Sequence, residues 1–196
     1  MIIYESPQGS DAWKQEKAGK FSASKCSDLL MTPSKAGHQN LIYRIVYERF
    51  TGEPTESYHS KDMDDGVENE PIARESYELH TYNKVHQVGF MELNDWIGAS
   101  LDGLVGDDGG IEIKCVKYNT QIDYLLANKV PTNYYNQIQF QLYVSGRKWI
   151  DFFSWHPKLP PLLITVKRDE EKINEIQDAL FKAIKEVESI INKLKG

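Results

Sequence analysis

The chain has 196 residues, of which 40% are hydrophobic and 27% are charged, and its formal net charge is −6. These values are ordinary for one globular domain and exclude a fibre or a disordered chain. The negative charge argues against a protein that coats nucleic acid through a generic basic surface. Two cysteines, Cys26 and Cys115, are too few for a four-thiolate zinc or iron–sulfur site. Because no apolar run approaches about 18 residues, and because residues 1–6 lack the features of a signal peptide, we expect a cytoplasmic protein with no membrane span.

The first half of the chain is predicted to be mainly helical. We predict helices over residues 11–17, 25–31, 40–50 and 66–77. Ser10 or Asp11 is suited to cap the first helix, and Ser22 or Ser24 the second, because short polar side chains accept hydrogen bonds from the first free amides of a helix.

The second half alternates strands and helices. We predict strands over residues 85–92, 96–104, 111–116, 148–155 and 162–167, and helices over 120–129, 131–144 and from 169 onward. The Gly and Asp residues at 106–110 indicate a β-hairpin between the second and third strands. A long apolar stripe runs along the last helix from Ile173 to Leu194. The sequence therefore predicts an α/β fold in one domain over residues 1–196, with a mixed β-sheet flanked by helices and a long C-terminal helix.

The predicted hairpin carries charges where a strand usually has few. Glu112 and Lys114 leave the same face of their strand, since side chains alternate with a period of two. Asp102, at the end of the preceding apolar stretch, can reach that face from the neighbouring strand. Two carboxylates suit Mg2+ or Mn2+, and an ammonium beside them can orient a water or bind a phosphate. The alternative is a surface hairpin with one ion pair and an Asp-Gly turn.

Three further groups of polar residues stand out. Lysines at 14, 17, 20 and 25, with the hydroxyls of Ser22 and Ser24, form a phosphate site or a solvated basic face. Glu70 lies in the early part of its predicted helix, where an acidic residue is favourable, and is spaced to be an i,i+4 partner of Arg74. Gln137 and Gln141 share one face of a predicted helix, where amides usually decorate the surface.

The order of these motifs resembles the PD-(D/E)xK nucleases, in particular phage exonucleases with a YqaJ-type or lambda-exonuclease-like domain. The resemblance rests first on Ser100-Leu-Asp102-Gly-Leu104 followed, after the turn, by Ile111-Glu112-Ile-Lys114-Cys115. It implies a restriction-endonuclease-like fold. It also implies that Asp102, Glu112, the Ile113 carbonyl and Glu70 hold Mg2+ or Mn2+, with two ions per site.

The same resemblance assigns roles to residues outside the hairpin. Trp13, Lys17 and the Ser22–Ser24 run match positions that hold a 5′ phosphate, with Ser100 as a further phosphate contact. Lys17 stands where arginine is expected, and a lysine offers a point charge in place of a planar fork. Gly66-x-x-x-Glu70 with Arg74 matches a second motif. Tyr134 and Gln137 match a third, in which the glutamine contacts the catalytic centre beside Lys114.

The resemblance implies a metal-dependent 5′ to 3′ exonuclease acting on linear double-stranded DNA and leaving 3′ single-stranded overhangs. It further implies a ring-shaped homotrimer, a single-strand-annealing recombination protein as partner, and a phage or prophage protein working in the bacterial cytoplasm. Two other functions remain open from the residues alone. One is an endonuclease or repair nuclease with the same core, and the other is a DNA-end-binding module without catalytic activity.

Overall fold

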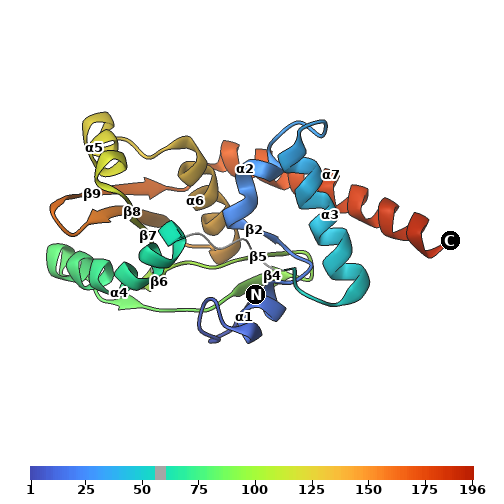
Figure 1. Ribbon diagram of the computed structural model, residues 1–196, viewed down its shortest axis with the longest axis horizontal. Coiled ribbons are helices and arrows are strands. Elements are labelled where there is room, and N and C mark those ends of the chain that lie inside the picture. Colours follow the sequence, from blue (N-terminus) through green and yellow to red (C-terminus); the bar gives the residue numbers. More distant parts are fainter. Residues whose placement is uncertain (56–60) are drawn as a thin grey trace.

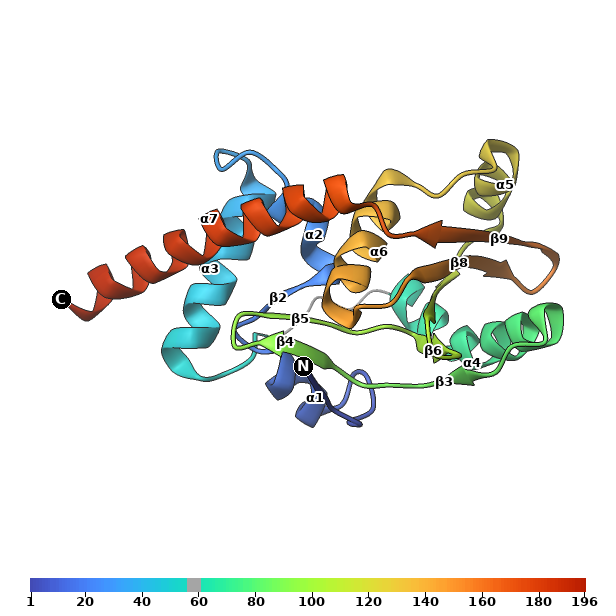
Figure 2. The same cartoon turned by 180° about the vertical axis from the view of Figure 1, so that it is seen from behind.

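The computed structural model describes the backbone of residues 1–55 and 61–196, and the side chains of the same ranges except 61–65 and 67. Within these residues the chain forms two mixed β-sheets flanked by helices, and a long C-terminal helix runs across the back and projects beyond the body (Figures 1 and 2). The predicted α/β fold class is therefore confirmed, although the strands divide into two sheets. No helix in the described ranges is both long and apolar enough to cross a membrane.

Each sheet combines parallel and antiparallel pairs. The four-stranded sheet has the order β1 (Ile2–Ile3), β4 (Met91–Asn94), β5 (Ile97–Ala99) and β2 (Phe21–Ser22). The five-stranded sheet has the order β3 (Val85–His86), β6 (Gly103–Val105), β7 (Gly109–Cys115), β8 (Trp149–His156) and β9 (Leu159–Lys167). The parallel pairs are β2 with β5 and β7 with β8, and the crossover between β7 and β8 is helical.

The predicted hairpin is present as β6 and β7. Gly103 pairs with Ile111 and Val105 with Gly109, and Gly106 in the turn has φ +53°, which favours glycine. The preceding strand is not continuous, however. Residues 97–99 and 103–105 belong to different sheets, because in the break between them the carbonyls of Ser100 and Leu101 accept side-chain amides of Gln141 and Gln8 instead of pairing with a strand.

The predicted strand over 85–92 is likewise divided, into β3 and β4. The N-terminal segment takes over its pairing: the amide of Tyr4 donates to the Phe90 carbonyl, and the amide of Gly89 donates to the Tyr4 carbonyl. A Cβ atom at Gly89 would lie 2.3 Å from the Ser6 carbonyl oxygen, so glycine is required for this close approach. This N-terminal strand was not predicted from the sequence.

The helices agree in position with the predictions; α1 has the predicted bounds, and the others differ at their ends. They are α1 (Asp11–Lys17), the 3-10 turn η1 (Ala23–Lys25), α2 (Cys26–Leu29), α3 (Ala36–Thr51), α4 (Lys61–Thr81), α5 (Tyr118–Ala127), α6 (Thr132–Ser145) and α7 (Glu170–Lys195). The hydroxyl of Ser10 accepts the Trp13 amide and caps α1 as predicted. The predicted helix over 25–31 is shorter, and no side chain caps η1 or α2.

A second strand boundary also differs from the prediction. The sequence predicts a strand over residues 162–167, but β9 begins at Leu159 and includes Pro160 and Pro161. Within the described residues β9 pairs only with β8 and forms an edge of the sheet. Both prolines lie where the β8–β9 register shifts between Ser154 and His156, and neither has a register partner there. Proline is accepted at such an irregularity of an edge strand because no ladder hydrogen bond needs its amide.

The main core lies where α6 crosses between the sheets and the helices α2, α3 and α7. Ile138, Phe140 and Leu142 of α6 are fully buried in it, together with Phe152 of β8. A second cluster lies between α4 and the five-stranded sheet, around Tyr77 and Phe153. Phe152, Phe153 and Trp155 of β8 are thus packing residues. The apolar stripe of α7 is buried over its first part, but Leu194 near its end is exposed.

Below α4, the buried carboxylate of Asp151 is held by two hydroxyl groups. Tyr77 donates to its Oδ2 atom at 2.7 Å and Thr165 donates to its Oδ1 atom at 2.6 Å. Burial and then the hydrogen bond to Asp151 raise the pKa of Tyr77, so the phenol keeps its proton. A buried carboxylate that loses a donor is costly.

We expect Tyr77→Phe to lower the free energy of unfolding by about 1–3 kcal/mol, since Asp151 would keep only one hydroxyl donor. Urea denaturation measures this change. Tyr82→Phe is the matched control, because Tyr82 is 93% exposed. Equal stability of the two variants would contradict the role assigned to the Tyr77 hydroxyl.

Candidate active site

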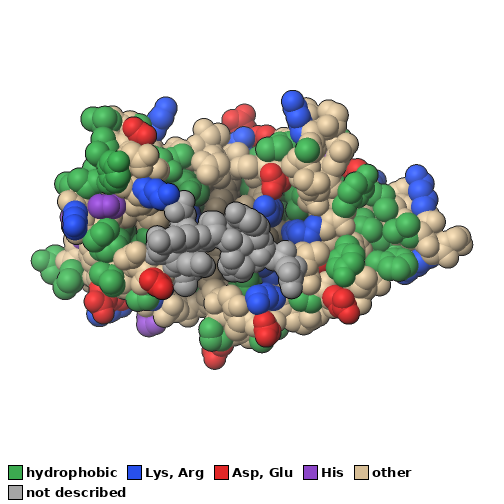
Figure 3. Space-filling view, in the orientation of Figure 1, with side chains coloured by type: hydrophobic (Ala, Val, Ile, Leu, Met, Phe, Trp, Pro, Cys, Tyr) green, Lys and Arg blue, Asp and Glu red, His purple; other side chains and the backbone are tan. Residues whose placement is uncertain are grey.

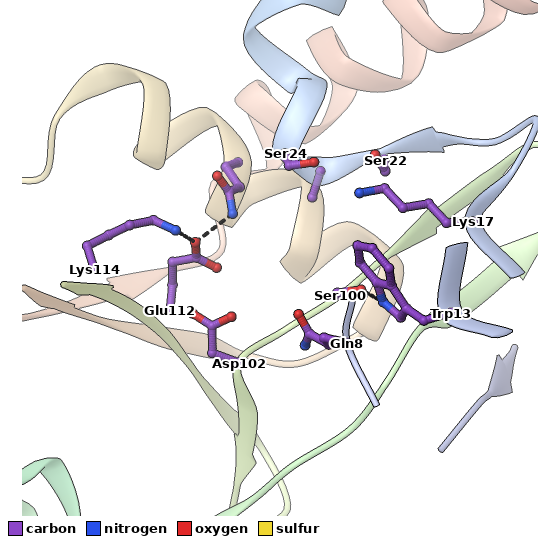
Figure 4. Close-up of a pocket in the computed structure, with 11 residues that line it drawn as sticks. Gln8, Trp13, Lys17, Ser22, Ser24, Ser100, Asp102, Glu112 and Lys114 are labelled. Carbon is purple, nitrogen blue, oxygen red and sulfur yellow. Dashed lines mark hydrogen bonds and ion pairs between the residues drawn. The ribbon is translucent and has the colours of Figure 1, made fainter. Parts of the chain in front are cut away.

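A cavity of about 190 Å³ lies between the β6–β7 hairpin, α6 and the N-terminal segment. Its lining residues are Gln8, Trp13, Lys17, Ser22, Ala23, Ser24, Ser100, Asp102, Glu112, Lys114 and Gln137. Figure 4 shows that they form two groups, with the acidic residues and Lys114 at one end and Lys17, the serines and Trp13 at the other. Nearly all of the residues predicted for the site therefore line one cavity.

The acidic end is built by the hairpin. Glu112 and Lys114 project from the same face of β7, and the Lys114 ammonium lies 2.5 Å from Glu112 Oε1. Asp102 comes from the break before β6, and its Oδ2 atom accepts the amide of Ile113 at 2.6 Å. That hydrogen bond fixes the Asp102 carboxylate beside β7, as the sequence predicted.

Glu112 is the most enclosed charge of the site, with 1% of its surface exposed. Besides Lys114, it accepts the Gln137 amide at Oε1 and the Gln141 amide at Oε2, both at 2.6 Å. Gln141 also donates to the Ser100 carbonyl at 2.9 Å. One turn of α6 thereby fixes both the catalytic carboxylate candidate and the backbone next to Asp102.

Gln141 is a site residue that the predictions did not include. The signal was present in its spacing, because Gln137 and Gln141 lie four residues apart and share a helix face. Gln8 was also missed. It lines the cavity and donates to the Leu101 carbonyl at 2.8 Å, but it belongs to an irregular segment whose path no local pattern predicts.

The charges at the acidic end are strongly coupled. Burial, and then the charge of Glu112, raise the pKa of Asp102 well above its usual range. Burial alone would lower the pKa of Lys114, but the charges of Glu112 and Asp102 outweigh it and keep that pKa above its ordinary value. The site therefore holds its lysine charged, and it favours a further positive charge beside the two carboxylates.

This donor set fits a divalent ion that also binds the substrate. Mg2+ is commonly held by one or two carboxylates, with waters and phosphate oxygens completing its coordination. Asp102 and Glu112 supply two carboxylates. With two carboxylates as protein ligands, the remaining coordination positions are left for water and phosphate, as in an open site. Within the described residues no group of three or more His, Cys, Asp and Glu side chains is arranged to hold a metal.

Glu70 and Ile113, the other two residues predicted for the metal site, are not among the lining residues of the cavity. The Oε1 atom of Glu70 is 2.5 Å from Nη2 of Arg74, the i,i+4 partner expected from the spacing. Its charge still acts on the site, because Glu70 contributes to the raised pKa of both Asp102 and Cys115. Burial, the first cause, raises the pKa of Cys115 to about 12, so this thiol stays neutral beside the site.

The other end of the cavity offers hydroxyl and ammonium groups. The indole of Trp13 donates to the Ser100 hydroxyl at 2.9 Å, and the Lys17 ammonium lies 4.5 Å from the centre of the Trp13 ring. Lys17 points toward Ser22 and Ser24 (Figure 4). The Ser22 hydroxyl is buried without a hydrogen-bond partner among the described residues. Such a group beside an ammonium is suited to meet an anion.

Lys17 is held at a cost in stability. Burial, and then the positive charge of Arg44, lower its pKa to about 8. The folded chain therefore releases this proton more readily than the unfolded chain does. The destabilisation is complete below pH 8 and disappears as the pH rises toward the ordinary value of 10.5.

We expect Lys17→Met to be more stable than the wild type at pH 7, by at most about 3 kcal/mol, with a difference that shrinks toward pH 10. Urea denaturation at several pH values measures it. Lys14→Met is the matched control on the same helix, since Lys14 pairs with Asp11 at the surface. A stability difference that does not change with pH would contradict the account of Lys17.

Comparisons with known proteins agree with this geometry. An alkaline exonuclease from Laribacter hongkongensis is 34% identical and has a TM-score of 0.88, with 95% of this chain and 96% of that chain covered. The structure of the same enzyme in complex with dAMP gives the same values. A phage-related exonuclease from Haemophilus somnus has a TM-score of 0.70 at 14% identity, covering 92% of this chain and 99% of that one, and this likeness shows the fold alone. The curated proteins give no match.

The family comparison covers the elements that build the cavity. The model of the YqaJ-like viral recombinase domain matches residues 12–148. This range begins beside Trp13, includes the hairpin, and ends after α6 with its two glutamines. The predicted resemblance is confirmed, and the chain belongs to the YqaJ-like viral recombinase family.

Proposed function

We propose that this chain is a nuclease of phage recombination, and specifically a metal-dependent 5′ to 3′ exonuclease that acts on linear double-stranded DNA. The family and the alkaline exonuclease at 34% identity over 95% of the chain support the nuclease. The whole chain, residues 1–196, would act as one such domain. Its product would carry 3′ single-stranded overhangs for recombination by single-strand annealing.

The observation that carries this proposal is the division of one cavity into two ends. Carboxylates and Lys114 lie at one end, and a buried unpartnered hydroxyl, Lys17 and Ser24 lie at the other. The acidic end suits the scissile phosphate with its metal, and the other end suits a second phosphate. If the two ends of the cavity held two phosphates of one DNA strand at a fixed separation, the phosphodiester bond next to the end of that strand would lie at the acidic end.

The carboxylates of Asp102 and Glu112, with the Ile113 carbonyl, would hold Mg2+ or Mn2+, and two ions per site are proposed. Glu70 would assist from outside the cavity as an outer ligand or a ligand of the second ion. When bound, the metal supplies a water of lowered pKa and neutralises charge that develops on the phosphate oxygens. Gln137 and Gln141 hold Glu112 in one orientation through their amides, which prepares the carboxylate for its ligand.

Lys114 is proposed to orient the attacking water or to bind the scissile phosphate. Its ammonium is kept charged by Glu112 and Asp102 and lies 5.2 Å from the centre of the Tyr134 ring. Gln137 donates to the same Glu112 oxygen as Lys114. A phosphate or water would therefore meet a lysine whose position is set by two neighbours, not a freely moving side chain.

The 5′ polarity is proposed from the other end of the cavity. Lys17 and Ser24 would bind the 5′ phosphate, with Ser100 and Trp13 completing the wall. Trp13 keeps Ser100 in place through its indole hydrogen bond. The complex of the similar alkaline exonuclease with dAMP supports a pocket for a nucleotide with a phosphate.

The proposal includes a ring-shaped homotrimer, a single-strand-annealing partner and action in the host cytoplasm. Exposed apolar side chains on two separate groups of helices support an assembly. Tyr43 of α3 and Phe181 of α7 are exposed, as are Leu79 of α4 and Leu126 of α5. Figure 1 shows α3 and α7 toward one side of the molecule and α4 and α5 toward the other. Unlike surfaces on opposite sides favour a head-to-tail contact, which generates a ring if it closes.

With Mg2+, we expect the protein to remove nucleotides from the 5′ ends of a linear duplex and to leave a closed circle intact. A duplex labelled at one end, with and without a 5′ phosphate, reveals the polarity on a sequencing gel, and EDTA should stop the reaction. Lys114→Ala should reduce the rate by about 10²–10⁴-fold while DNA binding remains. Lys148→Ala is the matched control, since Lys148 pairs with Asp108 outside the cavity.

Cutting of the circle would replace the exonuclease with an endonuclease or repair nuclease. Binding of the DNA end without cleavage in any metal would favour an end-binding module. Full nuclease activity of the Lys114→Ala variant would refute the catalytic role proposed for Lys114.

Divalent ions should stabilise the folded protein through Asp102. At a concentration ten times the dissociation constant, the gain is about 1.4 kcal/mol, which raises the Tm by about 3–5 °C. Asp102→Asn should lose this response, yet without metal it should be at least as stable as the wild type, because it removes a carboxyl whose pKa burial raises. Thermal unfolding with Mg2+ and with EDTA measures both effects. An equal Mg2+ response in the variant would contradict the metal site.

A further inference from the structure

A second cavity, of about 290 Å³, lies between α2 and α3. Its lining residues are Lys25, Asp28, Gly37, Asn40, Leu41 and Arg44. The two cavities are lined by neighbouring residues of the chain, because Ser24 lines the first cavity and Lys25 lines the second. Figure 3 shows Lys and Arg side chains gathered on this face near α2 and α3. Nothing in the role proposed for the first cavity uses this surface.

Arg44 has an unusual set of contacts for a partly buried guanidinium. Its Nη1 atom donates to both carboxylate oxygens of Glu48 at 3.1 Å. Its Nε and Nη2 atoms are shielded from solvent and have no hydrogen-bond partner among the described residues. These two nitrogens form one edge of the guanidinium, the fork that binds two oxygens of a carboxylate or phosphate at once.

Glu48 does not account for the position of Arg44 by itself. The buried Glu48 carboxylate also accepts the Gly19 amide at 2.8 Å and the Thr55 hydroxyl at 2.6 Å. The Glu48 carboxylate therefore receives hydrogen bonds from neutral donors as well as from Arg44. Through Gly19, the same carboxylate connects Arg44 to the turn that follows Lys17.

Positive charge exceeds negative charge around this cavity. Lys17, Lys25 and Arg44 are opposed by Glu48 and Asp28, and both Arg44 and Lys25 lower the pKa of Lys17, after burial as the first cause. Lys25 is 52% exposed and lies 3.4 Å from Asp28. That contact is long and solvated, so the ammonium can turn to another anion at little cost.

We propose that the cavity between α2 and α3 is a second phosphate-binding site, in which the unpartnered Nε–Nη2 edge of Arg44 and the Lys25 ammonium hold a further phosphate of the DNA duplex, other than the terminal and scissile phosphates of the first cavity. The proposal rests on the DNA substrate proposed above. A phosphodiester fits better than a carboxylate ligand, because the first cavity already offers sites for two phosphates, and Ser24 of that cavity and Lys25 of this one are neighbours in the chain.

The test is DNA binding in EDTA, measured by fluorescence anisotropy over a range of salt concentrations, with duplexes carrying either a 5′ phosphate or a 5′ hydroxyl. We expect Arg44→Gln and Lys25→Gln each to weaken binding of both duplexes by the same factor. Each should also reduce the slope of log affinity against log salt by about one. Arg44→Lys should keep the slope but not the full affinity, since it keeps the charge without the fork.

The variants also control for folding. Arg44→Gln leaves Glu48 without its cation and its Tm is measured in parallel, whereas Lys25 is exposed enough to be replaced without harm. Lys193→Gln, near the end of α7, is the matched exposed control and should bind as the wild type does. If Arg44→Gln and Lys25→Gln keep the wild-type slope and affinity, the second site is refuted.

The second site is also refuted if Arg44→Gln weakens binding of the 5′-phosphorylated duplex alone, because Arg44 would then contact the terminal 5′ phosphate. The proposed nuclease activity is tested separately. If the wild type binds DNA but does not cleave it with Mg2+, the exonuclease proposal is refuted, while the salt dependence of DNA binding by the variants still tests the second phosphate site. If the wild type binds no DNA, both proposals are refuted.

Discussion

The buried carboxylate of Glu112 is the constraint on which the rest of the site depends. A negative charge with 1% exposure needs several donors, and it receives them from Lys114, Gln137 and Gln141. These contacts tie β7 to α6 and fix the depth of the helix against the sheet. Because Gln141 also binds the Ser100 carbonyl, the same network sets the break from which Asp102 enters the cavity.

The cavity keeps charges in positions that folding alone would not favour. Asp102 lies beside Glu112 with a raised pKa, and Lys17 is held near Arg44 with a lowered one. Each arrangement disfavours the ionised group in the free protein. A cation at the acidic end and an anion at the basic end relieve both, which is the pattern expected of a site that binds a metal and a phosphate together.

The sequence predicted those parts of the site that follow from local spacing. The two-residue period brought Glu112 and Lys114 to one face, the Gly and Asp residues marked the hairpin turn, and Ser10 capped α1. The resemblance, read from motif order, identified the family that the comparisons confirm. Elements defined by short, regular patterns were therefore predictable.

What the sequence could not show depends on contacts between distant segments. The division of 96–104 into two strands follows from amides of Gln8 and Gln141 reaching its carbonyls. The pairing of Tyr4 with Phe90 and the buried, unpartnered edge of Arg44 likewise depend on tertiary placement. Gln141 had the right spacing beside Gln137, but a helix face alone does not tell whether it meets a carboxylate or water.

We propose that Asp102 and Glu112 form the metal end of a nuclease cavity, and the anomalous scattering of Mn2+ in crystals grown with a short 5′-phosphorylated duplex tests this directly. We expect a peak between the two carboxylates, with the terminal phosphate at the end of the cavity formed by Lys17 and Ser24. A peak elsewhere, or none beside a DNA end seated in the cavity, would contradict it.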